Sequence, residues 1–218
     1  MKLLLTSGGI TNKSITNALL DLAGRPFAEL KLAFIPTAAD VEKGSKEWLI
    51  NDLGNLKSLG FAKIDIVDIS AVPRENWESR LKEADILVFG GGNTYHLMYW
   101  LGKSGLAEIL PDLLKSRVYV GISAGSMVAG CKISLSTSER LYYKEEGQYN
   151  DEKGLGFVNF LMRPHLNSSH FPKIRKEFLE ETAKEIKEPI YAIDDQTAIQ
   201  VVDGDIKIIT EGDYLKFN

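Results

Sequence analysis

The stretch SRVYVGISAGSMVAG, residues 116–130, decides how the middle of this 218-residue chain folds. It begins with an apolar, β-branched run, which is typical of a strand buried on both faces. Gly121 and Gly125 then bracket Ser123, and small residues compatible with a helix follow. A G-x-S-x-G turn between a strand and a helix is the pattern of a nucleophile elbow. We therefore predict that Ser123 is a nucleophile; the alternative is a hydrogen-bonded serine in a tight glycine turn.

Apolar runs alternate with longer amphipathic stretches on both sides of this turn. We expect strands within residues 2–8, 30–38, 63–70, 85–92 and 117–123. This alternation predicts an α/β three-layer sandwich with a mainly parallel sheet. Four further short apolar runs, between residues 189 and 217, predict a small antiparallel C-terminal meander. Since no linker-like segment interrupts the pattern, we expect a single α/β hydrolytic domain over residues 1–218.

The charge, the cysteine content and the lengths of the apolar runs indicate which binding partners and which cellular compartment to expect. The chain has 26 Lys and Arg against 30 Asp and Glu, a net charge of −4, which favours neither nucleic acid nor an anionic membrane surface. A single cysteine, Cys131, excludes an internal disulfide and indicates a reducing compartment. No apolar run approaches the roughly 20 residues that span a bilayer, and the N-terminal apolar run is too short for a signal peptide. We therefore expect a cytoplasmic protein that does not associate with membranes.

A second glycine-rich turn closes the fourth expected strand. It reads FGGGNTYHL, residues 89–97. In open α/β sheets, sites lie beyond the carboxyl ends of the strands, so this turn and the serine turn are expected to meet. Exposed backbone N–H groups at such a meeting point suit an oxyanion hole. The alternatives are a phosphate-binding turn, for which no phosphate motif is present, or a plain helix start capped by Asn93 or Thr94.

A serine nucleophile usually needs a histidine base, and the chain has three candidates. His96 lies just inside the helix expected after the glycine triplet, and His170 lies near the start of a later helix. His165 ends the apolar run FVNFLMRPH, at a strand end where site residues gather. We therefore expect His165 to be the base.

The orienting acid is expected at the end of another apolar run, YAIDDQTAIQ. It places Asp194 and Asp195 side by side, and adjacent strand residues point to opposite faces, so at most one of them should face the site. Glu139 in STSERL is a further candidate, and a solvated turn with two ordinary aspartates is the alternative.

The motifs FGGGNTYHL, GISAGS, RPH and DDQTAIQV, in this order, resemble those of the peptidase E (aspartyl dipeptidase) family of serine peptidases, to which cyanophycinase is related. The N-terminal stretch LLLTSGG and the later segment LAFIPTA are also similar to sequences of this family. The resemblance covers essentially the whole chain. It implies the class I glutamine-amidotransferase-like (flavodoxin-like) fold, with a mainly parallel sheet between helices.

The resemblance also implies roles for individual residues. Ser123 matches the nucleophile, His165 the base and Asp195 the acid. The oxyanion donors correspond to Ala124 and to the glycine triplet, at Gly92 with Gly91 beside it. Amidotransferases of this fold use cysteine at the elbow, where this chain has serine, so glutamine amidotransfer is not expected.

Two departures from the family concern substrate selection. Peptidase E relies on an arginine downstream of the histidine, but the corresponding stretch, HLNSSHFPKIRKEF, is shorter here. Arg175 and Arg163 are candidates for that cation, and Asn93 is a further candidate for substrate binding. The acid position carries Asp where peptidase E has Glu. Hydrolysis of short peptides therefore follows more directly than selection of an N-terminal aspartate.

The expected function is that of a serine-type exopeptidase or dipeptidase acting through an acyl-enzyme on Ser123, with N-terminal Asp a candidate preference. We expect a small peptide as the partner, a monomer or a homodimer, and no metal or cofactor. Three alternatives stay open: cyanophycinase-like hydrolysis of β-linked Asp-Arg peptides, a serine esterase, and a non-catalytic ligand-binding module. In an α/β-hydrolase esterase the triad follows the chain order serine, acid, histidine, so the histidine comes late in the sequence. Here no histidine follows His170, and the expected order is serine, histidine, acid.

Overall fold

The computed structural model describes residues 1–142 and 151–218. Its strands are β1 (Lys2–Thr6), β2 (Lys31–Ile35), β3 (Lys63–Ile66), β4 (Ile86–Phe89), β5 (Val118–Ile122), β6 (Leu161–Arg163), β7 (Ile190–Ile193), β8 (Thr197–Val202), β9 (Asp205–Thr210) and β10 (Tyr214–Phe217). Its α-helices are α1 (Lys13–Ala23), α2 (Glu47–Ser58), α3 (Arg74–Glu83), α4 (Thr94–Lys103), α5 (Leu106–Leu113), α6 (Ala124–Met127), α7 (Leu135–Leu141) and α8 (Lys176–Ala183). Short 3₁₀ turns, η1 (Phe27–Glu29) and η2 (Thr37–Ala39), flank β2.

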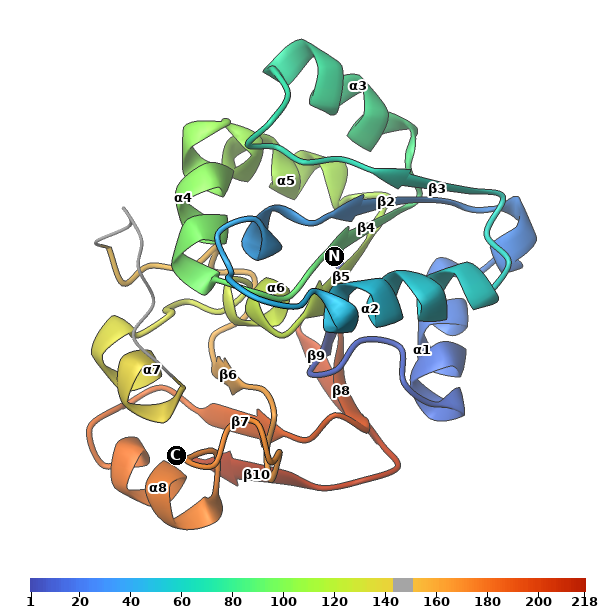
Figure 1. The fold of residues 1–218 in the computed structure, drawn as a ribbon. Helices are drawn as coiled ribbons and strands as arrows, with labels where there is room; N and C mark the ends of the chain where they lie inside the picture. Colours follow the sequence, from blue (N-terminus) through green and yellow to red (C-terminus); the bar gives the residue numbers. More distant parts are fainter. Residues whose placement is uncertain (143–150) are drawn as a thin grey trace.

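The main sheet has the order β3-β2-β4-β5-β1-β8-β9 (Figure 1). Its first five strands are parallel, and β8 and β9 add to it antiparallel. The chain moves outward from β1 to β2 and β3, and then returns through β4 and β5. Because crossovers between parallel strands are right-handed, this reversal places the early and late helices on opposite faces. The α/β fold with a mainly parallel sheet is thus confirmed.

Successive side chains of the central strands point to opposite faces of the main sheet and contribute to two apolar cores, one on each face. Leu4 and Val120 pack with α1 and α2 on one face, whereas Leu3 and Tyr119 pack with α3, α4 and α5 on the other. Figure 1 shows these two groups of helices on either side of the sheet. Among the described residues, no helix has the length and apolar character needed to cross a bilayer.

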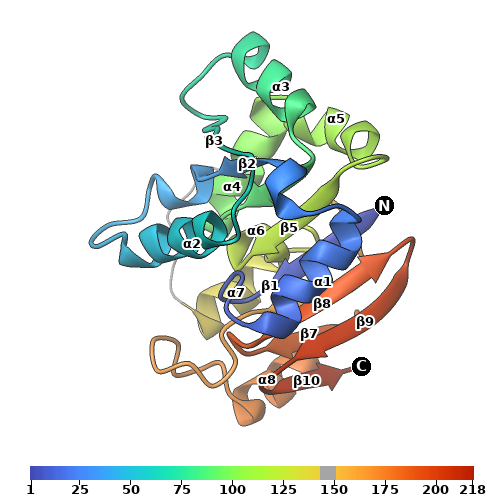
Figure 2. The ribbon, with the colours of Figure 1, turned by 90° about the vertical axis from the view of Figure 1, so that its right-hand side faces the viewer.

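The C-terminal strands pair antiparallel, but they are shared between two sheets instead of forming one meander. β8 and β9 extend the main sheet beyond β1, whereas β7 pairs with β10 and with β6 in a separate sheet of order β10-β7-β6 (Figure 2). The second sheet packs against the core that contains α4 and α5, through the side chains of Phe160, Met162, Tyr191 and Ile193. The turn between β7 and β8 therefore connects the two sheets.

This arrangement brings five chain segments to one edge of the molecule. The parallel strands β1, β4 and β5 all end there, and each is followed by a turn rich in glycine or serine. The segment after β6 and the turn after β7 approach the same edge from the second sheet. The candidate site is built from these five segments.

Candidate active site

Ser123 occupies a sharp turn between β5 and α6. Its backbone angles are φ 48° and ψ −107°, a conformation that few non-glycine residues adopt and that stores strain. A methyl group on Gly121 would lie 2.6 Å from the backbone nitrogen of Ser126, and one on Gly125 would lie 2.0 Å from the carbonyl oxygen of Phe89. The two glycines of the motif therefore allow α6 to close onto β5 and β4, which leaves Ser123 at the tip.

Three side chains form a hydrogen-bonded chain at this tip. The hydroxyl of Ser123 lies 2.9 Å from Nε2 of His165, and Nδ1 of His165 lies 2.8 Å from Oδ1 of Asp195. His165 follows β6, and Asp195 lies in the turn after β7. The structure thus places the predicted nucleophile, base and acid in the order and at the distances that proton transfer from the serine requires.

Ser7, directly after β1, is a fourth member of this network that the motifs did not indicate. Its fully buried hydroxyl donates to Oδ1 of Asp195 and accepts a hydrogen bond from the backbone N–H of His165, at 2.7 Å. Nearby, the hydroxyl of Thr11 donates to the backbone carbonyl of Asp195 at 2.6 Å. The loop after β1 therefore holds the acid and the base against each other. The position of Ser7 at the end of a buried parallel strand is the one sequence signal that could have suggested it.

The electrostatics of Asp195 suit an acid that stays ionised. Burial alone would raise its pKa, but the hydrogen bond and charge of His165, with the hydrogen bond from Ser7, outweigh burial and hold the pKa below its usual value. The more distant charge of His170 acts in the same direction. An ionised carboxylate at this place is the partner that the base of a serine triad requires to orient its ring and to stabilise an imidazolium.

The segment that follows His165 closes over the imidazole. The ring of Phe171 stacks on that of His165, with centroids 4.7 Å apart and planes inclined by 21°. The guanidinium of Arg175 donates to the backbone carbonyls of Ser168, at 2.9 Å, and Ile174, at 3.0 Å. Arg175, a candidate for substrate binding, thus stabilises the loop that carries Phe171.

The glycine triplet lies against the serine turn. A methyl group on Gly91 would be 3.4 Å from Cβ of Ser123. Among the residues that the structure describes, the backbone N–H groups of Gly91, Gly92 and Ala124 donate to no protein acceptor. Free N–H groups beside a nucleophile are what an oxyanion hole requires. Asn93, in contrast, caps α4, since its side chain accepts a hydrogen bond from the backbone N–H of the third residue that follows, at 2.7 Å.

The other candidate acids and bases lie outside the hydrogen-bonded chain. Asp194 accepts hydrogen bonds from Thr197 and from the backbone of the β9–β10 turn, which fits the expectation that only one of the two aspartates faces the site. Glu139 is carried by α7, away from the contacts of His165. His96 is half-buried on α4, and burial lowers its pKa. His170 is exposed in the loop after β6.

Arg163, at the end of β6, is sealed in the interior. Only 1% of its surface is exposed, and its Nη1 donates to the carbonyl of Met162 at 3.3 Å. Within the described part of the chain, its Nε and Nη2 atoms have no hydrogen-bond partner. Burial lowers its pKa, while the neighbouring Tyr95 and Tyr142 act in the opposite direction. In this arrangement Arg163 is separated from solvent and offers no open surface to a substrate.

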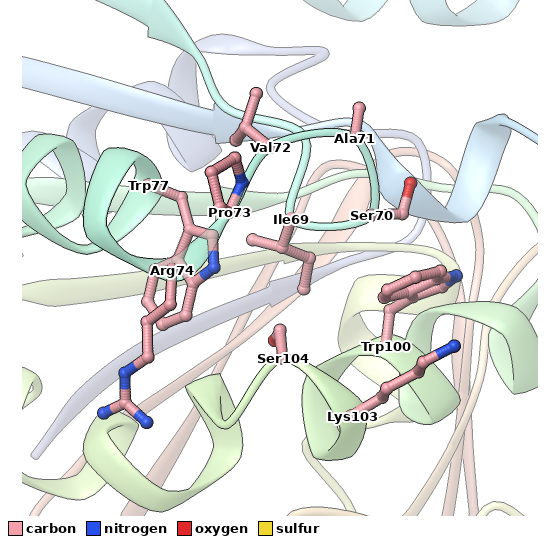
Figure 3. A pocket seen from close by; sticks show the side chains of 10 residues that line it. All are labelled: Ile69, Ser70, Ala71, Val72, Pro73, Arg74, Trp77, Trp100, Lys103 and Ser104. Carbon is pink, nitrogen blue, oxygen red and sulfur yellow. The ribbon is translucent and has the colours of Figure 1, made fainter.

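A surface hollow lies between the segment 69–74, α3 and α4 (Figure 3). Trp77 and Trp100 contribute to its walls, and Lys103 extends beside Trp100 with its ammonium 4.6 Å from the ring centre. None of the hydrogen-bonded residues at Ser123 lines this hollow. In residues 1–142 and 151–218, no three His, Cys, Asp or Glu side chains are grouped as ligands of a metal ion would be.

The chain is similar in sequence and in fold to known peptidases. The uncharacterized peptidase PM1590 of Pasteurella multocida is 27% identical over 192 residues, which cover 87% of this chain and 89% of that protein. Peptidase E of Shewanella oneidensis is 32% identical over 143 residues, 65% of this chain and 56% of the relative. A crystal structure of a peptidase E-type protein from Listeria monocytogenes EGD-e superimposes with a TM-score of 0.80 at 24% identity, covering 97% of this chain and 98% of the other.

The family model of peptidase family S51 matches residues 3–209, nearly the whole chain. The chain therefore belongs to peptidase family S51. It is a serine peptidase, and its substrates are peptides.

Proposed function

We propose that this protein is a serine-type exopeptidase that hydrolyses short peptides through an acyl-enzyme on Ser123. The observation that carries the proposal is the hydrogen-bonded chain from Ser123 through His165 to Asp195. His165 takes the hydroxyl proton through Nε2 as Oγ of Ser123 attacks the scissile carbonyl carbon. The resulting imidazolium then gives this proton to the leaving amine, and water later releases the acyl group by the reverse sequence.

The developing oxyanion needs donors that are already in place. The N–H groups of Ala124, at the start of α6, and of Gly91 and Gly92, in the glycine triplet, donate to no described protein acceptor, and Gly91 lies against Ser123. One such donor is worth about 3 kcal/mol in the transition state. The turn after β4 and the turn after β5 would therefore act together.

The preferred N-terminal residue is the finer part of the proposal. The resemblance to aspartyl dipeptidases makes Asp the first residue to test. Arg175 is engaged with backbone carbonyls and Arg163 is sealed, so neither guanidinium faces an open site in this arrangement. Recognition of an aspartate side chain by either residue would require that part of the structure to rearrange.

Two measurements test the proposal. A panel of X-Leu dipeptides gives turnover for each N-terminal residue, and a fluorophosphonate probe reports whether Ser123 is reactive. Ser123→Ala should abolish both turnover and labelling, with a loss in kcat of up to about 10⁶-fold. A folded Ser123→Ala protein that keeps full activity would refute the assignment. Labelling without turnover of any peptide would refute the exopeptidase.

A further inference from the structure

Helix α2 places two side chains one turn apart at the border of the proposed site. Trp48 approaches the glycine triplet, since a methyl group on Gly91 would lie 3.6 Å from its ring. Asp52, four residues later, approaches the loop after β1, since a methyl group on Gly9 would lie 3.1 Å from its Oδ1. Residues four apart share a face of a helix, so this face is turned toward the turns that surround Ser123. Figures 1 and 2 both show α2 beside the α6 end of the sheet.

The side chains of Asp52 and Asp195 lie against two adjacent glycines of the turn after β1. A methyl group on Gly8 would lie 3.0 Å from Cβ of Asp195, whereas the adjacent Gly9 borders Asp52. The absence of side chains on Gly8 and Gly9 is what allows both acids to approach the turn. Asp195 is satisfied by His165 and Ser7, so Asp52 is the acid without an assigned task.

Asp52 is poorly solvated and lacks a counter-charge. It is 8% exposed, and in the part of the chain that the structure describes its carboxyl group forms neither a hydrogen bond nor an ion pair. Burial, together with the negative charge of Asp195, raises its pKa to about 7. A carboxylate that is buried without a partner is costly, and a cation supplied by a ligand would remove that cost.

We propose that Asp52 binds the free α-ammonium group of the peptide substrate and so selects for the end of a chain. This inference rests on the exopeptidase function proposed above and adds the residue that defines the substrate's N-terminus. Every short peptide with a free N-terminus carries this cation one residue from the first scissile bond. An ammonium at Asp52 would pair the unsatisfied carboxylate, and it would also offset the repulsion between Asp52 and Asp195.

The test compares Asp52→Asn with the wild type on three probes. The dipeptide Ala-Leu carries the ammonium, and propionyl-Leu is the same molecule without it. The labelling rate of Ser123 by a fluorophosphonate, which has no amine, reports the reactivity of the nucleophile alone. Glu47→Gln is the matched control, because it removes the same charge from an exposed side chain of the same helix.

We expect Asp52→Asn to lower kcat/KM for Ala-Leu by about 30-fold or more, as loss of one partner of a desolvated charge pair does. Turnover of propionyl-Leu and the labelling rate should stay within threefold of the wild type, and Glu47→Gln should leave all three unchanged. Equal losses on every probe would overturn the inference and assign Asp52 a structural role. A loss confined to peptides with N-terminal Lys or Arg would also overturn it.

The failure of this inference is distinct from the failure of the proposed function. If the wild type labels at Ser123 and cleaves Ala-Leu, the exopeptidase stands, and an unchanged preference in Asp52→Asn refutes only the role of Asp52. If wild-type turnover survives Ser123→Ala, the proposed function itself is refuted. Thermal melting of each variant verifies that the protein compared is folded.

Discussion

The hydroxyl of Ser7 is expected to set the catalytic efficiency of the proposed triad without touching the substrate. Ser7→Ala removes the donor to Asp195 and the acceptor for the backbone N–H of His165. A hydrogen bond to a charged group contributes about 1.5–3 kcal/mol. Since 44% of the Asp195 side chain is exposed, water can replace part of the lost hydrogen bond. We therefore expect Ser7→Ala to raise the activation free energy by about 1–2 kcal/mol, which is a five- to thirtyfold loss in kcat/KM.

The assay is steady-state hydrolysis of a dipeptide by Ser7→Ala, with Ser126→Ala as the matched control. Ser126 is also fully buried, and its hydroxyl donates to the backbone carbonyl of Thr6 at 2.7 Å and to none of the triad side chains. Its backbone N–H donates to the carbonyl of Ser123 at 2.9 Å, a bond that the substitution keeps. Both substitutions should lower the melting temperature. Only Ser7→Ala should lower kcat by the stated amount, while KM stays nearly constant because Ser7 is fully buried.

The pH profile separates a positioning role from a structural one. The hydrogen bond from Ser7 helps to hold the pKa of Asp195 below its usual value. Its removal should therefore move the protonation of Asp195, and the activity lost with it, to higher pH on the acid side of the profile. If Ser7→Ala and Ser126→Ala reduce kcat equally and leave the acid limb unmoved, the proposed role of Ser7 is refuted.

Three further outcomes are expected. His165→Ala should be nearly as damaging to turnover as loss of the nucleophile, whereas His96→Ala and His170→Ala should keep much of the activity in the same dipeptide assay. Gly92→Ala should cost about 2–5 kcal/mol, because its φ is +123° and the added methyl would lie 2.3 Å from a backbone oxygen; a melting temperature lowered by less than about 3 °C would contradict this. Asp52→Asn should stabilise the fold increasingly as the pH rises from about 4 to 7. The reason is that a pKa raised from 3.8 to about 7 makes the buried charge cost roughly 4 kcal/mol above pH 7, and equal melting shifts at pH 5 and pH 8 would exclude it.

The alternation of apolar runs and amphipathic stretches was sufficient to predict the main sheet and its class. Each expected strand from residue 2 to residue 123 contains an observed strand, although the expected ranges extend into the turns. The reason is local, since burial on both faces of a parallel strand demands a continuous apolar run. Ser123 and His165 could likewise be proposed from the strand ends on which they lie, whereas the choice of Asp195 over Asp194 came from the resemblance to the family.

Tertiary structure alone decided how the distant segments combine. The four C-terminal strands have similar local patterns, yet β8 pairs with β1, from the other end of the chain, while β7 joins β6. The roles of Ser7 and Phe171 around His165, and the approach of Asp52 to Gly9, depend on contacts between residues far apart in sequence. Local periodicity records which face of each element is buried, but the choice of neighbour depends on packing free energy summed over the whole core. The sequence by itself therefore determined the elements and the residues that end them, and only packing decided which of those residues meet.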